Sequence, residues 1–282
     1  MFWCVLWAVV VVVGVGGLLI SINNLRFARE VAREVTALWS SDTPLPRVDA
    51  ERLQQLPALV RDYLAKALGE APRAARSVRF RHSGRFRTKL DAPWQRIHGE
   101  QYDAAAPPGF VWWGRLRIAP GVWVDARDRA LNGVGNMFVS LESSFTLFDV
   151  SGPQMDQGSL LRLLSELVLL PGALADERYV TWVAVDASHA RATLRLHATE
   201  VTGTFEFGAD GLPASFAAER YFDSGQGQAQ LLPWSGTYED YRRVNGLLVP
   251  HHLVAYWHVG GERVPYVDFL LETPEYDPPG AF

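Results

Sequence analysis

The sequence is poor in cysteine and in net charge. Cys4 is the one cysteine among 282 residues, which excludes an internal disulfide framework and a cysteine-rich zinc site. The 27 Lys and Arg residues nearly balance the 31 Asp and Glu residues, and the formal net charge is -4. No whole-chain field therefore favours nucleic acid as a partner, and we expect none.

The sequence also lacks the common catalytic motifs. It contains no Gly-x-Ser-x-Gly turn, no His-Glu-x-x-His pair and no Gly-x-x-x-x-Gly-Lys-Ser/Thr loop, so hydrolase, zincin and phosphate-loop chemistry have no support. The adjacent His251 and His252 would point to opposite faces of a strand and could not share a metal ion. Glu166 follows Arg162 by four residues, so we expect the two side chains to form an ion pair on a helix surface. We therefore do not expect Glu166 to serve as an acid catalyst. The sequence favours a protein that is not an enzyme, with no metal and no cofactor.

What the sequence does contain is a long apolar run at its N-terminus. The 21 residues from Phe2 to Ile22 include no charged side chain. At about 1.5 Å per residue, such a helix spans roughly 30 Å, the thickness of a bilayer core. A cleaved signal peptide is the alternative, but no Lys or Arg precedes the run, and the run exceeds the roughly 7 to 15 apolar residues of such peptides. We expect residues 1–23 to form a transmembrane anchor.

The residues after the anchor predict a stem, a linker and the side of the membrane. Arg26, Arg29 and Arg33 follow the apolar run and no basic residue precedes it, so the positive-inside rule favours a cytoplasmic domain on a single-pass membrane protein. Residues 24–39 have the spacing of a polar helix. The stretch 40–46 contains two prolines and reads as a linker. The expected division is anchor 1–23, stem and linker 24–47, and a β-rich soluble domain 48–282.

The soluble domain begins with a short helix and then alternates with period two. A helix is predicted between Pro57 and Gly69, because apolar residues recur every three or four positions. Residues 77–90 alternate as a strand. One face of that strand is apolar and the other is basic, the basic side chains being Arg79, Arg81, Arg85, Arg87 and Lys89.

Further strand patterns fill the rest of the chain around one mid-chain helix. Asp156 is a candidate N-cap for a helix with an apolar face from Leu160 to Val168 and with Arg162 and Glu166 opposite. Asn245-Gly246 predicts a hairpin. The expected strands are 94–102, 110–118, 121–125, 136–148, 179–185, 190–198, 201–207, 214–222, 231–242, 247–259 and 264–272. The pattern predicts an α+β fold with a large, curved, mainly antiparallel sheet, open-barrel-like, packed on a few helices and preceded by one transmembrane helix.

Several runs within residues 137–272 resemble a bacterial family of uncharacterised proteins, a domain of unknown function with an N-terminal membrane anchor. The runs are Gly152 to Gly158, Phe207 to Pro213 with Arg220 and Tyr221, and the set Trp234, Tyr238, Tyr241, Gly246, Pro250 and Trp257. The resemblance implies no activity. The arrangement is also similar, more loosely, to periplasmic lipoprotein carriers whose incomplete barrel holds acyl chains, although the cytoplasmic orientation argues against that likeness.

Two groups of side chains are candidates for binding. Aromatic residues and one arginine could line a cavity for an apolar ligand; core packing is the alternative interpretation. These residues are Trp112, Trp113, Trp182, Arg220, Tyr221, Trp234 and Trp257. The basic strand face could contact anionic lipid headgroups; the alternative is an edge strand protected by charge.

Three functions remain open at this point. The leading hypothesis is a membrane-anchored, non-catalytic module that binds a lipid or other apolar ligand in a sheet-lined cavity. The second is an enzyme that acts on an apolar substrate with residues brought together only by folding. The third is a structural or assembly partner at the membrane, for which a large exposed apolar patch would be the distinguishing observation.

Overall fold

One antiparallel sheet organises the computed structural model, which describes the chain except residues 1, 47, 70–73 and 224–228. In the N-terminal helix, the side chains of residues 2, 4–6, 8–10, 12 and 13 are also outside the description. The strands are β1 (Ser77–Phe86), β2 (Gln95–Ala105), β3 (Pro108–Ala119), β4 (Val122–Leu131), β5 (Val134–Leu141), β6 (Phe145–Ser151), β7 (Val180–Ala184), β8 (His189–Leu196), β9 (Thr199–Phe207), β10 (Pro213–Phe222), β11 (Gln230–Val244), β12 (Leu247–Val259), β13 (Glu262–Leu271) and the short β14 (Glu275–Tyr276).

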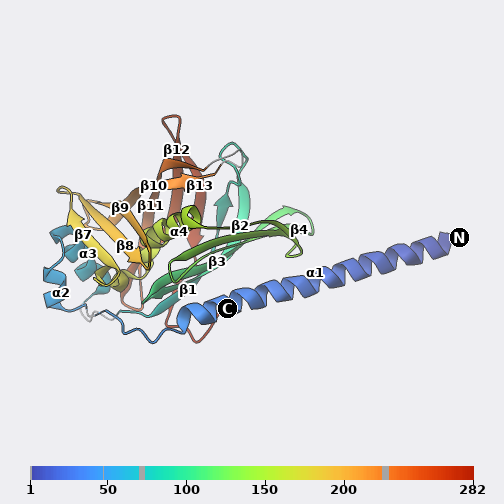
Figure 1. Ribbon diagram of the computed structural model, residues 1–282, viewed down its shortest axis with the longest axis horizontal. Helices are drawn as coiled ribbons and strands as arrows, with labels where there is room; N and C mark the ends of the chain where they lie inside the picture. The colour runs from blue at the N-terminus through green and yellow to red at the C-terminus, as the bar shows by residue number, and fades with distance from the viewer. Residues whose placement is uncertain (1, 47, 70–73, 224–228) are drawn as a thin grey trace.

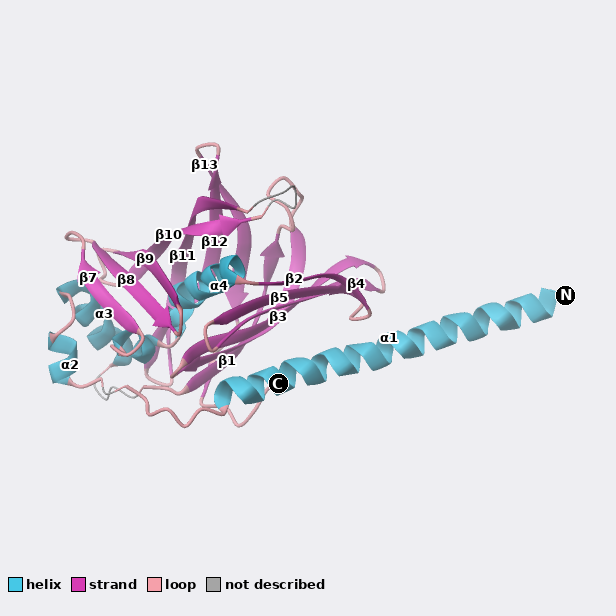
Figure 2. Ribbon diagram, viewed as in Figure 1, coloured by secondary structure: helices cyan, strands magenta, loops and turns pink. Residues whose placement is uncertain are grey.

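The sheet consists of two meanders joined side by side. Its order is β6-β5-β4-β3-β2-β1-β13-β12-β11-β10-β9-β8-β7, with β14 paired to β1. Each meander links neighbours in sequence, and the pairing of β1 with β13 joins them. The sheet curves into a half-barrel around a helix, as Figures 1 and 2 show. The predicted α+β class with a large curved antiparallel sheet is confirmed.

Turn chemistry explains where the strands end. Asn245 and Gly246 have φ of 50° and 89° and join β11 to β12, as the Asn-Gly pair predicted. The single strand expected over 136–148 is wrong, because the chain turns between β5 and β6. Glu142 and Ser143 have φ of 50° and 52° at this turn. Neither is a glycine or asparagine, so the turn carried no sequence signal.

Helix α4 (Pro153–Glu166) lies on the concave face of the sheet (Figure 1). It begins after Gly152, so the expected N-cap at Asp156 is wrong; the Asp156 carboxylate instead accepts a hydrogen bond from the Gly135 N–H of β5 at 2.7 Å. Two short 3-10 helices, η1 (Leu167–Leu169) and η2 (Pro171–Ala175), continue the chain inside the core. Helices α2 (Ala50–Gln54) and α3 (Ala58–Leu68) pack nearby, and α3 ends at Gly69 as predicted.

Helix α1 (Phe2–Trp39) combines the expected anchor and stem in one continuous element. Its C-terminal part is less polar than expected, because Phe27, Val31, Val35 and Leu38 form a buried cluster with residues of β2 and β3 on the convex face. The helix leaves the sheet near Asn23, whose side chain donates to Ser144 Oγ at 3.2 Å. The rest of α1 projects beyond the sheet (Figure 1).

Among the residues that the structure describes, no helix has both the length and the hydropathy needed to cross a membrane.

Candidate functional site

Strand register defines which side chains share the concave face. Phe80 of β1 lies opposite Gln101, which lies opposite Trp112 of β3. The same inward-facing set includes Trp234 of β11 and its partner Trp257 of β12. Because side chains alternate along a strand, the neighbours of these residues face outward. The concave face has a covered part beneath α4 and an uncovered part.

The covered part buries a network of charged and amide side chains. Arg162 of α4 donates to Asp128 (2.8 Å), Glu166 (2.9 Å) and Gln101 (2.9 Å). Gln101 also donates to Glu166 (2.7 Å) and Asp103 (2.9 Å). The Arg162–Glu166 pair expected from the spacing is present, but it lies in the interior and not on the helix surface; the Arg162 side chain is 13% exposed.

Burial shifts the proton affinities in this network. Burial alone would lower the pKa of Arg162, but the Glu166 and Asp128 carboxylates outweigh it and raise that pKa. The pKa of Asp103 is well above its usual range, chiefly because of burial and then because of the nearby Glu166 charge. Asp103 Oδ2 has no hydrogen-bond partner among the described residues. Arg162 thus neutralises two carboxylates, while burial favours the protonated form of Asp103.

The predicted residue Trp112 is buried beside a histidine. Its indole N–H donates to His82 Nε2 at 2.8 Å, and the His82 ring stacks on Phe269 with 4.0 Å between centroids. Burial lowers the pKa of His82 to about 3, and the charge of Arg162 adds to that effect. His82 is therefore a neutral hydrogen-bond acceptor at pH 7.

The N-terminal end of α4 braces both walls of the half-barrel. Asp156 holds β5 through the Gly135 N–H. On the opposite wall, Gln157 donates to the Glu219 carbonyl of β10 at 2.8 Å. The helix is thus hydrogen-bonded to both walls of the sheet. β5 and β10, which flank the uncovered part of the concave face, are therefore held in place by α4.

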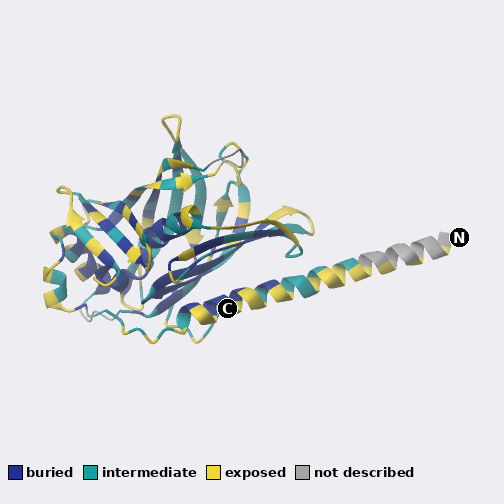
Figure 3. Cartoon of the chain, viewed as in Figure 1, coloured by how far each residue is buried: buried dark blue, intermediate teal, exposed yellow. Residues whose placement is uncertain are grey.

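The uncovered part, which we call the open concave face, is lined by exposed apolar side chains. On edge strand β6, Phe145, Phe148 and Val150 are 64%, 48% and 45% exposed. They lie opposite Leu141, Val139 and Met137 of β5, which places them on the concave side. Partly buried residues continue this surface across the sheet to the other wall, namely Phe86, Val124, Leu232, Ala255, Val267 and Phe222. Figure 3 shows intermediate burial over the strands above α4.

Arg220 introduces a positive charge on the far wall of this surface. Its guanidinium carbon lies 5.0 Å from the Trp234 ring centroid and 5.8 Å from that of Trp257. Arg220 Nη1 and Trp234 Nε1 both donate to Tyr266 Oη, at 3.3 and 3.0 Å. Among the described residues, Arg220 has no carboxylate within ion-pair distance, and its Nε is buried without a hydrogen-bond partner. The structure thus brings three predicted residues together, Arg220, Trp234 and Trp257.

The other predicted residues lie elsewhere. Trp113 is on the convex face, where it contacts Phe27 of α1 and donates to Asp125 at 3.0 Å. Trp182 donates to the Leu174 carbonyl at 2.8 Å and packs in the core. Tyr221 neighbours Arg220 on β10 and therefore faces outward, where it is 37% exposed.

Sequence reasoning missed Tyr266, Phe86 and the β6 residues. Tyr266 is the extra residue at an irregularity in the β12–β13 pairing, between Pro265 and Val267. Such a bulge breaks the period-two pattern that would assign a residue to a face. The exposed aromatic residues of β6 were not identified, because the turn at residues 142–144 was not predicted and β6 was assigned to the same strand as β5.

The basic face predicted on residues 77–90 is partly neutralised. Arg79 pairs with Glu275 at 2.7 Å, Arg81 pairs with Glu100 at 3.3 Å, and Arg85 pairs with Asp268. The edge-strand interpretation is wrong, because β1 lies between β2 and β13 in the middle of the sheet. The strand ends at Phe86, so Arg87 and Lys89 follow it in the loop. Contact of these residues with a membrane surface stays a prediction.

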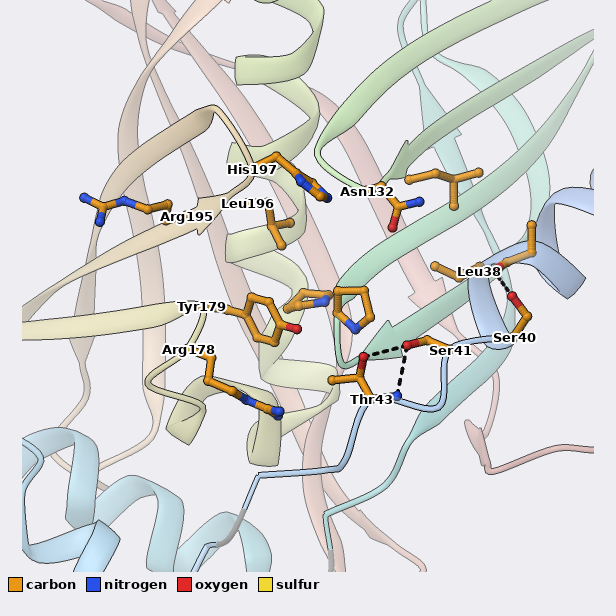
Figure 4. A pocket seen from close by; sticks show the side chains of 14 residues that line it. Leu38, Ser40, Ser41, Thr43, Asn132, Arg178, Tyr179, Arg195, Leu196 and His197 are labelled. Carbon is orange, nitrogen blue, oxygen red and sulfur yellow. Dashed lines mark hydrogen bonds between the residues drawn. The ribbon is translucent and has the colours of Figure 1, made fainter.

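Two cavities in the described part of the chain lie away from the open concave face. The larger, about 640 Å³, is enclosed by the linker, the β4–β5 turn and the β8–β9 turn (Figure 4). Its cations are engaged: Arg178 bonds Asp176 and the Pro44 carbonyl, and Arg195 bonds Glu200. The second, about 520 Å³, lies between the β9–β10 turn and β11. His82 and Asp103 line neither cavity, so the perturbed pKa values of these two groups belong to the packed interior beneath α4.

The fold and this surface define an α+β half-barrel with one helix across its concave face. Residues 46–269 match the model of a family of unknown function (DUF6544), and the chain belongs to that family; the expected membership in an uncharacterised family is confirmed. No curated protein matches the chain.

Two solved structures are similar in outline. A LolA superfamily protein from Nitrosomonas europaea shares 11% identity with a TM-score of 0.36, over 77% of this chain and 92% of that protein. A DUF1329 family protein from Desulfovibrio piger shares 11% identity with a TM-score of 0.42, over 73% of this chain and 88% of that protein.

Proposed function

We propose that this protein is a membrane-tethered, non-catalytic module that binds a lipid or other apolar ligand on its open concave face. The observation that carries the proposal is the inward-facing apolar edge, where Phe145, Phe148 and Val150 are 45% to 64% exposed. Water-soluble surfaces seldom leave contiguous aromatic and aliphatic side chains uncovered unless they bind something. Partly buried apolar residues lie on the neighbouring strands as well, so an acyl chain is a suitable occupant.

The tether is the projecting part of α1. At the β5–β6 turn the helix leaves the sheet, and the uncharged residues 2–22 lie beyond it. Trp7 and Leu18 in this part are 67% and 60% exposed, which suits a lipid environment better than water. The flanking Arg26, Arg29 and Arg33 favour a cytoplasmic half-barrel on a single-pass protein.

Membrane extraction tests the tether. We expect the full chain to remain in the membrane pellet at high pH and to be released by detergent, whereas a chain lacking residues 1–22 should enter the soluble fraction. Protease added to right-side-out vesicles should leave the half-barrel intact, and permeabilised vesicles should lose it. Recovery of the full chain in the high-pH supernatant would contradict the tether, and cleavage in sealed vesicles would contradict only the orientation.

Lipid extraction tests the ligand. The full chain is purified in a mild nonionic detergent and analysed by native mass spectrometry and by organic extraction. We expect a co-purifying apolar molecule at a defined stoichiometry. Phe148→Asp should lose it because a carboxylate opposes burial of an acyl chain. The control is Val183→Asp on the opposite edge strand β7, where the side chain faces outward and is 65% exposed. Equal occupancy in both variants, or a bare protein mass for the parent chain, would contradict binding on this face.

A further inference from the structure

We infer that the ligand is an anionic amphiphile drawn from the bilayer, whose negatively charged head is held by Arg220 while its chain covers the open concave face. This inference rests on the proposed function and adds the chemical class of the ligand. Its basis is the contrast between Arg220 and Arg162, the buried arginine of the same concave face.

Arg220 differs from the buried arginine of the same concave face. Arg162 has two carboxylates within 2.9 Å. Arg220 has none among the described residues, and its guanidinium donates to the hydroxyl of Tyr266. A cation that is partly removed from water without a counter-charge raises the free energy of the protein, and a bound anion would lower it again.

The surroundings of Arg220 fit a head group at the end of a chain. The rings of Trp234 and Trp257 lie within cation–π distance of the guanidinium, with 5.0 and 5.8 Å from its carbon to the ring centroids. Tyr266 Oη receives hydrogen bonds from Arg220 and Trp234, so its own O–H can be donated to an acceptor nearby. Phe222, two residues along β10 from Arg220, is on the same face and packs against Trp257 at 4.9 Å between centroids. A carboxylate or phosphate at Arg220 would therefore continue directly into apolar surface.

The source of the anion follows from the same arrangement. A free phosphate ion would satisfy the guanidinium but would leave Phe148 and the other apolar residues of the open concave face exposed. An amphiphile satisfies both, because its charge meets a cation and its chain removes apolar area from water. The apolar part of α1 diverges from the sheet at the β5–β6 turn, and as a membrane tether it would bring bilayer amphiphiles close to the open concave face. We therefore infer a membrane amphiphile and not a soluble anion.

The test compares a 16-carbon fatty acid with the 16-carbon alcohol on the full chain in nonionic detergent, with bound fractions measured by native mass spectrometry across a titration. The parent protein should bind the acid at least tenfold more tightly than the alcohol. Arg220→Gln should bind both about equally, and Arg220→Lys should restore part of the preference. Arg263→Gln is the matched control, because Arg263 also stacks on an aromatic ring, Tyr256, but on the outward face of the sheet; it should keep the full preference. Excess inorganic phosphate should not displace the acid.

Each other result has a defined meaning. Equal binding of acid and alcohol by the parent, or an unchanged preference in Arg220→Gln, would overturn the role of Arg220 and leave the proposed function standing. Displacement by inorganic phosphate would assign the site to soluble anions. Failure of the parent to bind either amphiphile would overturn the proposed function itself. Circular dichroism of each variant confirms that folding is retained before binding is compared.

Discussion

The covered and open parts of the concave face use the same sheet in opposite ways. Beneath α4, polar side chains such as Arg162 and Asp128 are buried and satisfy one another. On the open concave face, apolar side chains such as Phe148 are exposed to water, and Arg220 has no carboxylate partner within the part of the chain that the structure describes. Groups that normally prefer water are buried, and groups that avoid water are exposed. The comparison indicates that the covered part maintains the fold, and the open part is the surface on which we propose that a ligand binds.

Removing the buried cation should produce the largest change. Arg162→Leu leaves the carboxylates of Asp128 and Glu166 in the interior without a counter-charge, and breaking such a pair typically costs about 3 to 5 kcal/mol. We expect that loss in the free energy of unfolding measured by urea denaturation. Arg220→Gln should lose less than about 1 kcal/mol, because a partly exposed cation without an ion pair contributes little. Equal losses in the two variants would remove the distinction between the two parts of the face.

Lowering the pH should reduce the stability of the covered part through protonation of His82. The folded state holds the pKa of His82 at about 3, whereas the unfolded chain has about 6.5. The unfolded state therefore binds more protons between these values, and the contribution of His82 to stability falls as pH drops below 6.5, by about 2 kcal/mol at pH 5. His82→Gln keeps an acceptor for the Trp112 N–H and removes the titration. The difference in stability between parent and variant should grow in favour of the variant from pH 7.5 to pH 5; a difference independent of pH would show that His82 titrates normally.

Asp103 should respond to pH in the opposite direction. Its folded pKa is raised, so the folded state keeps a proton that the unfolded chain releases above about pH 4. Stability is therefore lost as pH rises from about 4 toward the folded pKa. Asp103→Asn retains an acceptor for Gln101 and cannot ionise, and we expect a net gain of about 1 kcal/mol at pH 7 after the cost of its unpaired amide. Thermal melts at pH 4 and pH 7 measure this; a variant less stable than the parent at pH 7 would contradict a protonated Asp103.

Local patterns allowed much of the fold to be predicted from the sequence. The alternation in 77–86, the Asn245-Gly246 turn and the end of α3 at Gly69 depend on neighbours in the chain, and each is found in the structure. The burial of Arg162 could not be predicted, because it depends on strands about 35 to 60 residues earlier in the chain. From the sequence alone, the charge of Arg162 predicts a position on an exposed helix surface. The curved sheet covers that side of α4 and buries the side chain.

The candidate site was predictable only in part for a related reason. Arg220, Trp234 and Trp257 were identified by residue type, and adjacent strands bring them together. Tyr266 was missed because a bulge shifts its face, and Phe148 because the turn before β6 lacks glycine and asparagine. The middle position of β1 depends on its pairing with β13, which is distant in sequence. The alternation of apolar and polar residues within a strand does not show which distant strand it pairs with.

The smallest expected effect concerns the stability of the open part. Phe148→Ser removes a ring that is 48% exposed, and such surface substitutions usually change the free energy of unfolding by less than about 0.5 kcal/mol. Phe110→Ser is the counterpart beneath α4, where the ring is fully buried and contacts the Arg162 guanidinium at 4.7 Å; its loss should cost about 3 to 5 kcal/mol. Both are measured by urea denaturation of delipidated protein. If Phe148→Ser destabilised the protein as much as Phe110→Ser, the β6 aromatics would be part of the core, and the exposed surface that motivates a ligand would not exist in solution.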